Sequence, residues 1–264
     1  MAEEHKPADD DKKDREKKAV EERLKRAPVA STGRVTTSGG RALAYRATCE
    51  YLPVQKLAFG NERGEPEAAV FTAAYELEGA TAAERPVCFA FNGGPGSSSV
   101  WLHLGALGPK RVVVPDDGSM PLPPYGVSDN PLTWLAHFDL VFVDPPHTGW
   151  SIAAGDDARK GLFSVDGDVA ALTEVMRGWL TRHKRWGSSV YLAGESYGTT
   201  RGAALADALL DANVALAGLI LVSCAMDLQS IVFAPRNDLP FALFLPAFAN
   251  VAQYHGKLKG PLAA

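Results

Sequence analysis

The stretch Val190-Tyr191-Leu192-Ala193-Gly194-Glu195-Ser196-Tyr197-Gly198 decides the fold. The apolar run over residues 190–193 predicts a buried strand, and the amphipathic run over residues 199–210 predicts a helix. Between them, a G-x-S-x-G pattern places Ser196 on a sharp strand-to-helix turn. Gly194 and Gly198 flank the serine because a side chain at either position would collide with the neighbouring strand or helix. The pattern predicts a Ser196 hydroxyl that projects above the edge of a sheet, positioned to attack a carbonyl.

A second glycine-rich turn, Asn92-Gly93-Gly94-Pro95-Gly96-Ser97-Ser98-Ser99, follows the apolar run over residues 87–91. It lacks the Gly-Lys-Ser/Thr ending of a phosphate-binding loop and the G-x-G-x-x-G spacing of a dinucleotide fold. Its backbone N–H groups can approach a substrate without interference from Cβ atoms. The helix after Ser196 directs its N-terminal amides and the positive end of its dipole to the same place. Together, the two turns predict a site for an oxyanion.

Strands and helices alternate through the middle of the chain. Residues 42–48 and 69–75 predict an antiparallel hairpin, joined by a polar connection that contains Gly60, Asn61 and Gly64. Further buried strands are predicted over residues 87–91, 138–143, 190–193 and 219–223, with a helix over residues 166–182. This alternation predicts an α/β fold: a mostly parallel sheet with flanking helices.

Composition restricts the class of protein. The hydrophobic share of 46% and the aromatic share of 9% are typical of a globular protein with a core. The net charge of −4 gives no electrostatic basis for binding nucleic acid or an anionic membrane, and no apolar run reaches the ~18 residues that span a bilayer. No spacing typical of metal ligands occurs, and Cys88 and Cys224 lie in apolar runs that favour buried thiols. We therefore expect no metal and no cofactor.

The first 34 residues differ from the rest of the chain. Residues 1–26 carry 18 charged side chains, nine of each sign, and almost no apolar ones. Such a segment cannot bury enough surface to offset its ordering entropy, so we expect disorder or a solvated helix over residues 1–34. The segment also lacks the apolar region of a secretory signal peptide. As written, the chain is expected in the cytoplasm, unless its true start lies elsewhere.

Four short motifs occur in a fixed order: Asn92–Ser98, Asn130–Trp134, Asp144–Ser151 and Gly194–Gly198. The first resembles the Asn-Gly-Gly-Pro-Gly-Cys/Ser-Ser signature of the serine carboxypeptidase family of α/β-hydrolases, and the last resembles that family's Gly-Glu-Ser-Tyr-Gly/Ala nucleophile motif. The second is similar to its Asn-Pro-x-Ser/Thr-Trp stretch, and the third to its Asp-x-Pro/Val-Gly-x-Gly-Phe/Tyr-Ser segment. The resemblance covers residues 35–264, is greatest to the bacterial branch, and implies the α/β-hydrolase fold.

This resemblance implies hydrolysis of a peptide at its free C-terminus. It assigns Ser196 as the nucleophile, and the backbone N–H groups of Gly94 and Tyr197 as the oxyanion hole. The residues that hold the terminal carboxylate of the peptide are, by the same resemblance, Asn92, Gly93 through its amide, and Glu195. Two facing carboxylates repel each other unless one is protonated, so the resemblance also implies a preference for acidic conditions.

The sequence departs from the family at two places near these motifs. Ala106 stands where other members carry a second glutamate, which removes half of their paired carboxyl groups. Pro146 and His147 replace a small or apolar pair ahead of Thr148. Because the hydrolase order is serine, then acid, then histidine, the position of His147 before Ser196 favours a loop histidine at the rim of the cleft.

A third departure lies downstream of Ser196. The family places its catalytic Asp and His after two further strands, beyond a helical cap, and the sequence offers no such strands. Asp238 and His255 have the correct order after Ser196, but their surroundings resemble the start of the cap. We therefore expect a C-terminally truncated relative, with a partial hydrolase core over residues 35–226, its C-terminal strands missing, and the start of the cap over residues 227–264.

Three functions are compatible with these residues. The first is a serine carboxypeptidase by descent, which acts through an acyl-enzyme on Ser196. The second is a non-catalytic protein of hydrolase fold that binds peptide C-termini through Asn92 and Glu195. The third is an esterase that uses Ser196, Asp238 and His255.

Overall fold

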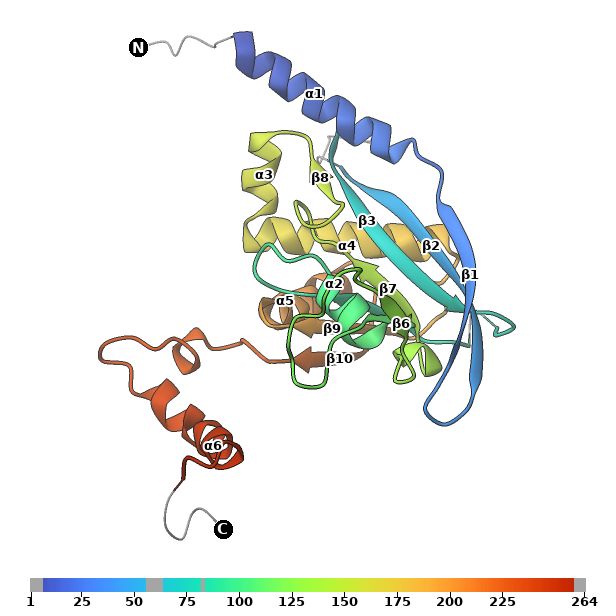
Figure 1. Ribbon diagram of the computed structural model, residues 1–264. Helices are drawn as coiled ribbons and strands as arrows, with labels where there is room; N and C mark the ends of the chain where they lie inside the picture. Colours follow the sequence, from blue (N-terminus) through green and yellow to red (C-terminus); the bar gives the residue numbers. More distant parts are fainter. Residues whose placement is uncertain (1–6, 56–63, 82–83, 259–264) are drawn as a thin grey trace. The chain divides into compact units, whose positions relative to one another are not determined.

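The computed structural model describes residues 7–55, 64–81 and 84–258 (Figure 1). The chain divides into two compact units, residues 1–224 and residues 225–264. The first unit contains the sheet and both glycine-rich turns. Of the predicted hairpin connection, Gly60 and Asn61 lie outside the described residues.

The first unit is built on a sheet with the strand order β1-β2-β3-β7-β4-β9-β10. The first three strands are β1 (Val29–Thr36), β2 (Ala42–Gln55) and β3 (Pro66–Leu77). β1 pairs with β2, β2 with β3, and β3 with β7, all antiparallel. The remaining strands run parallel: β7 (Asp139–Val143), β4 (Val87–Phe91), β9 (Val190–Glu195) and β10 (Leu216–Val222). The short β8 (Ile152–Ala153) pairs with β3.

Helices connect and cover the parallel strands, so the predicted α/β class is confirmed. The longer helices of the first unit that follow β7 are α3 (Asp156–Leu162), α4 (Val165–Arg182) and α5 (Tyr197–Asp211). Short helical turns lie at Val100–Leu102 (α2), His103–Leu107 and Trp134–Ala136. A separate two-stranded ribbon is formed by β5 (Lys110–Val112) and β6 (Val127–Asp129). None of the helices in the described ranges is long and apolar enough to cross a membrane.

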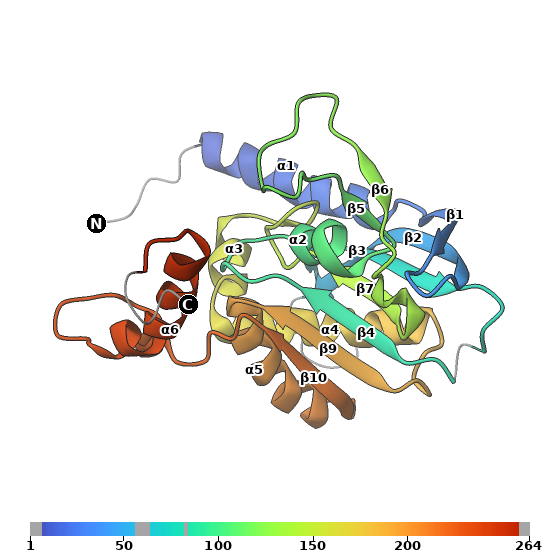
Figure 2. The same ribbon diagram turned by 60° about the horizontal axis from the view of Figure 1, so that its bottom comes forward.

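The order of the parallel strands brings the two glycine-rich turns together. β4 precedes β7 in the chain but lies beyond it in the sheet, between β7 and β9. The carboxyl ends of β4 and β9 are therefore neighbours, with Phe91 paired to Gly194. Each turn begins where one of these strands ends (Figure 2). Ligands of α/β proteins bind at such a point, where the strand order reverses.

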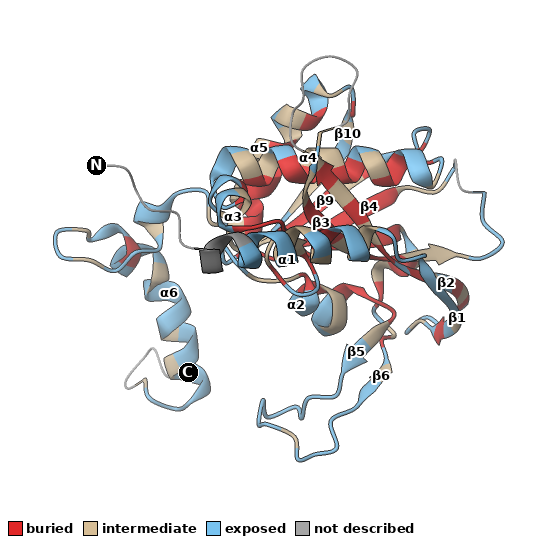
Figure 3. Ribbon diagram, turned by 90° about the horizontal axis from the view of Figure 1, so that it is seen from above, coloured by how far each residue is buried: buried red, intermediate tan, exposed pale blue. Residues whose placement is uncertain are grey.

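Packing on both faces explains the uninterrupted apolar runs of the inner strands. Every residue of β4 and β7 is buried, as expected for strands that are covered on two sides, and β4 is labelled among the buried strands in Figure 3. Phe89 and Phe91 join one core cluster with the buried side chains of α4, and the rings of Phe89 and Trp179 are 5.5 Å apart. Cys88 and Ala90, which alternate with them, join a second cluster. The sheet thus forms a rigid base for the turns at its edge.

The N-terminal segment is helical, the second of the two alternatives expected for it, but part of the helix is buried. It contains the helix α1 (Pro7–Leu24), and the sheet begins at Val29, before the predicted start near residue 35. Val20 of α1 is fully buried and packs in a small cluster with Ala69 of β3. Ion pairs also join α1 to α3, among them Glu16 with Arg159 at 2.5 Å. A few apolar residues in a charged helix give little sequence signal, which is why composition indicated a solvated segment.

The second unit contains one long helix. A 3-10 turn at Leu228–Ser230 precedes α6 (Leu239–Tyr254), which continues through Pro246. The ring of Phe233 lies 5.0 Å from that of Phe241 and 5.5 Å from that of Phe244. In the described residues after β10, no further strand joins the sheet. The predicted boundaries of a partial core and a cap stay predictions.

Candidate active site

Ser196 lies on the turn between β9 and α5, as the sequence predicts. Its backbone has φ 58° and ψ −126°, a conformation that residues other than glycine rarely adopt. The Ser196 N–H donates a hydrogen bond to the Val222 carbonyl (3.0 Å), and the Thr199 N–H donates one to the Ser196 carbonyl (2.9 Å). Both sides of the turn are therefore held. Strain maintained in this way is typical of catalytic and binding sites.

Close backbone contacts explain the glycines of both turns. A Cβ atom on Gly93 would stand only 2.7 Å from the Glu195 carbonyl oxygen and 2.7 Å from the Gly198 nitrogen. A Cβ atom on Gly198 would stand 3.0 Å from the Phe91 carbonyl oxygen. The glycine-rich turn after β4 therefore packs, backbone against backbone, on the first residues of α5.

One pocket of about 510 Å³ brings together most of the predicted site residues. Its lining is formed by Asn92, Gly94, Ser97, Trp101, Leu102, Glu195 and Ser196. The buried Asn92 side chain spans the site: its Nδ2 donates to Glu195 Oε2 (3.0 Å), and its Oδ1 accepts from the Leu102 N–H (3.0 Å). An amide donor, a carboxyl group and a serine hydroxyl thus share one pocket.

Of the two residues predicted for the oxyanion hole, Gly94 lines the pocket and Tyr197 is not among the residues that line it. Among the described residues, no carbonyl or side chain accepts a hydrogen bond from the N–H of Gly94 or of Tyr197. The Gly93 N–H also has no acceptor among the residues the structure describes. Backbone donors without a partner are rare in buried positions, and Gly93 is buried. The roles of these groups toward a substrate stay predictions.

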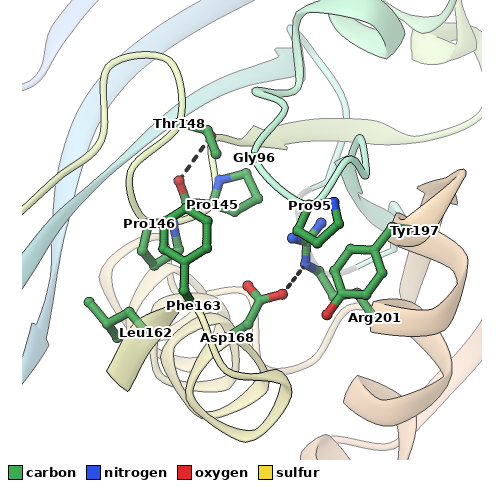
Figure 4. Close-up of a pocket in the computed structure, with 10 residues that line it drawn as sticks. All are labelled: Pro95, Gly96, Pro145, Pro146, Thr148, Leu162, Phe163, Asp168, Tyr197 and Arg201. Atoms are coloured by element: carbon green, nitrogen blue, oxygen red, sulfur yellow. Dashed lines mark hydrogen bonds and ion pairs between the residues drawn. The ribbon is translucent and has the colours of Figure 1, made fainter. Parts of the chain in front are cut away.

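The sequence analysis did not predict a buried ion pair that joins α4 to α5. Arg201 Nε donates to Asp168 Oδ2 (2.6 Å), and Arg201 Nη1 donates to the Asn92 carbonyl oxygen (2.6 Å). Figure 4 shows the pair, with the Tyr197 ring beside the guanidinium. Burial raises the pKa of Asp168, and the Arg201 charge opposes that rise. The sequence signal that could have predicted this pair is a charged residue on the buried side of each helix, Asp168 in one and Arg201 in the other.

Asp144, at the end of β7, holds the far end of the glycine-rich turn. Its Oδ1 accepts from both the N–H and the hydroxyl of Ser99, each at 2.9 Å. Its Oδ2 accepts from the Trp150 N–H at 3.1 Å, and the Ser151 hydroxyl donates to the Asp144 carbonyl at 2.7 Å. The Asp144–Ser151 motif therefore has a positioning role, because it fixes the loop that carries Gly93 and Gly94.

The Asn130–Trp134 motif supports the segment beside the pocket. Asn130 Nδ2 donates to the carbonyls of Ala106 (2.7 Å) and Gly108 (2.8 Å). The Thr133 hydroxyl donates to the Leu107 carbonyl at 2.9 Å. Ala106 itself is exposed and does not line the pocket. Two of the four motifs thus line the pocket, Asn92–Ser98 and Gly194–Gly198, and the other two hold neighbouring segments by hydrogen bonds.

Two histidines of the first unit, His103 and His147, pack against aromatic side chains. The Tyr75 hydroxyl lies 2.7 Å from His103 Nε2, and the His103 ring stacks on Phe142 with centroids 4.3 Å apart. Burial lowers the pKa of His103 to about 4, so its ring is neutral at pH 7 and shares a hydrogen bond with the Tyr75 hydroxyl. Burial also lowers the pKa of His147, whose ring lies 5.9 Å from Phe163. Within the described residues, no hydrogen bond joins a histidine to Ser196.

Asp238 and His255 cannot act as a pair in this fold. Asp238 is the N-cap of α6 and His255 is its C-cap. Because an α-helix rises 1.5 Å per residue, the two residues lie about 25 Å apart. A triad requires the acid and the histidine within hydrogen-bond reach. The esterase arrangement of Ser196, Asp238 and His255 is therefore wrong for this structure.

The strand order and the strained serine between a parallel strand and a helix define an α/β-hydrolase. The family model described as serine carboxypeptidase matches residues 60–232, and the chain belongs to this family. Its place in the bacterial branch and a truncated C-terminus stay predictions.

Relatives match part of the chain. It is 35% identical over 117 residues to the pheromone-processing carboxypeptidase KEX1 of Yarrowia lipolytica, covering 43% of this chain and 17% of that protein. It is 31% identical over 116 residues to carboxypeptidase Y of Saccharomyces cerevisiae, covering 44% and 20%. The match thus spans about a fifth of the length of these relatives. A rice cell wall degrading esterase LipA from Xanthomonas oryzae is 16% identical with a TM-score of 0.40, covering 86% of this chain and 59% of that chain.

The contact between the two turns predicts a strong effect of one added methyl group. We expect Gly93→Ala to lower the free energy of unfolding by about 2 kcal/mol or more, because the new Cβ meets backbone atoms that cannot move independently. Gly105→Ala is the matched control: nothing lies within 4 Å of its added Cβ, so stability should be unchanged within about 0.5 kcal/mol or slightly raised. Chemical denaturation measures both, and equal stabilities of the two variants would contradict the close contact.

Proposed function

We propose that this chain forms a serine hydrolase site of the carboxypeptidase type, which takes the C-terminal end of a peptide. The observation that carries the proposal is the hydrogen bond between Asn92 and Glu195 in the pocket that also contains Ser196. In such a pocket, the amide of Asn92 and the carboxyl group of Glu195 can hold the terminal carboxylate of a peptide. The Ser196 hydroxyl then lies near the carbonyl of the last peptide bond.

The proposed reaction is acyl transfer to Ser196. The Ser196 Oγ attacks the last peptide carbonyl, the N–H groups of Gly94 and Tyr197 stabilise the oxyanion, and the C–N bond breaks to release the C-terminal amino acid. Water then hydrolyses the ester on Ser196. The resemblance assigns the base that takes the serine proton to a histidine after two further strands. We therefore assign to this chain the nucleophile, the oxyanion donors and the carboxylate site.

A non-catalytic peptide-binding protein is the second candidate. It is favoured by the observation that, in the part of the chain that the structure describes, no histidine bonds to Ser196. A serine without a base keeps the poor nucleophilicity of an alcohol. Both candidates share the carboxylate site, so chemistry at Ser196 separates them.

Acylation of Ser196 is the test that separates these two functions. We expect a p-nitrophenyl ester of a blocked amino acid to add one acyl group to the protein, measured as an intact-mass shift and mapped to Ser196 by peptide sequencing. An activated ester has a good leaving group, so it demands less of a base. Ser196→Ala should not acquire the group. Equal acylation of the two proteins would contradict a nucleophilic Ser196, and carboxylate binding without acylation would favour the binding protein.

The carboxyl group of Glu195 predicts that its replacement changes the affinity for a terminal carboxylate. Two facing carboxylates repel each other, whereas the side-chain amide of Glu195→Gln can donate a hydrogen bond to the ligand. At pH 8, a blocked dipeptide with a free carboxylate should therefore bind about tenfold more tightly to Glu195→Gln than to the wild type. The same dipeptide with a C-terminal amide should bind the two proteins equally. Titration calorimetry measures all four cases, and weaker binding of the carboxylate to Glu195→Gln would refute the assignment.

A further inference from the structure

Arg201 is a charged residue that the proposed reaction does not use, although it is only 2% exposed. A buried cation costs several kcal/mol unless its partners compensate for lost water. Its guanidinium is bonded to Asp168 of α4 on one edge and to the Asn92 carbonyl on another. It also lies over the rings of Tyr197 (5.1 Å) and Phe91 (5.5 Å). These contacts leave it one orientation.

The bond from Arg201 fixes the peptide group that joins Asn92 to Gly93. This peptide is not among the cis bonds of the chain, and in a trans peptide the C=O and the N–H point in opposite directions. The Asn92 carbonyl points toward α5, where it meets Arg201 and lies 3.1 Å from the place of a Cβ on Gly198. The Gly93 N–H must therefore point away from α5. It is the buried donor that lacks an acceptor among the described residues.

We propose that Arg201, oriented by Asp168, is a positioning residue that aims the Gly93 N–H at the terminal carboxylate of the substrate. This inference rests on the proposed carboxylate site. A charge-assisted hydrogen bond to the carbonyl also polarises the peptide group, so its N–H becomes a stronger donor. Asp168 keeps the guanidinium in place and neutralises it, so the substrate carboxylate is recognised by a directed N–H and not by a free cation.

Variants of Arg201 must leave no unpaired charge buried, so that the protein stays folded. In Arg201→Met/Asp168→Leu, apolar side chains of similar size replace the whole ion pair, a change that is often tolerated. Arg201→Lys keeps the charge but cannot donate to Asp168 and Asn92 with the same fork geometry. Arg159→Met is the matched control, since Arg159 pairs with Glu16 and Asp156 and makes no bond to the glycine-rich turn.

Two measurements test the proposal. The ¹⁵N resonance of Gly93 in the free protein reports the hydrogen bond at the preceding carbonyl, and it should shift in the double variant and in Arg201→Lys but not in Arg159→Met. Affinity for the free-carboxylate dipeptide should fall about 10- to 100-fold in the double variant, while affinity for the amide form stays the same. A loss of affinity for the carboxylate dipeptide alone would not result from general destabilisation of the protein, which would weaken binding of both dipeptides.

The outcomes separate this inference from the function on which it rests. If the wild-type protein does not distinguish the carboxylate from the amide, the proposed function fails, and the Gly93 resonance alone decides whether Arg201 orients the peptide group. If the wild type does distinguish them and the double variant binds both dipeptides like the wild type, the positioning role is overturned. An unchanged Gly93 resonance in both Arg201 variants overturns it as well.

Discussion

The contact on which the rest of the site depends is the one between the backbone of the glycine-rich turn and the first residues of α5. Gly93 lies so close to Glu195 and Gly198 that no Cβ fits between them. This contact places Gly94 of one turn in the same pocket as Ser196 of the other, the residues to which we assign an oxyanion donor and the nucleophile. It is possible because β4 lies next to β9 in the sheet, so that both turns leave the same edge. The parallel strands thus act as a fixed base for two loops that come from distant parts of the chain.

Polar contacts hold this arrangement at both ends of the glycine-rich turn. Arg201 binds the carbonyl of Asn92 where the turn begins, and Asp144 binds Ser99 where it ends. The first contact comes from the helix that follows the nucleophile, and the second from the end of β7. A loop fixed from two elements loses little entropy when a ligand binds, which is how a preorganised site gains affinity and rate. The geometry of the pocket therefore depends on Arg201 and Asp144, which are not among the residues that line it.

Local patterns were sufficient to predict the elements that carry the site. The apolar runs before Asn92 and Gly194 predicted buried strands, and the glycines predicted two tight turns; both predictions follow from constraints within a few residues. The partnership of Arg201 with Asp168 could not be predicted in this way, because it joins two helices across 33 positions. The buried Val20 was likewise hidden by its charged surroundings. Chain order was also insufficient to predict a triad. Asp238 and His255 follow Ser196 in the order that a triad requires, but they cap opposite ends of one helix.

A crystal structure of the Ser196→Ala variant with a blocked dipeptide, grown at pH 5, tests the central claim most directly. The account predicts that the terminal carboxylate lies against Asn92, Glu195 and the Gly93 N–H. The scissile carbonyl carbon should lie about 3–3.5 Å from the position that the Ser196 hydroxyl oxygen occupies in the unsubstituted protein, with the carbonyl oxygen about 3 Å from the N–H groups of Gly94 and Tyr197. A dipeptide bound in the opposite direction, with its carboxylate away from Glu195, or bound outside this pocket, would contradict the account.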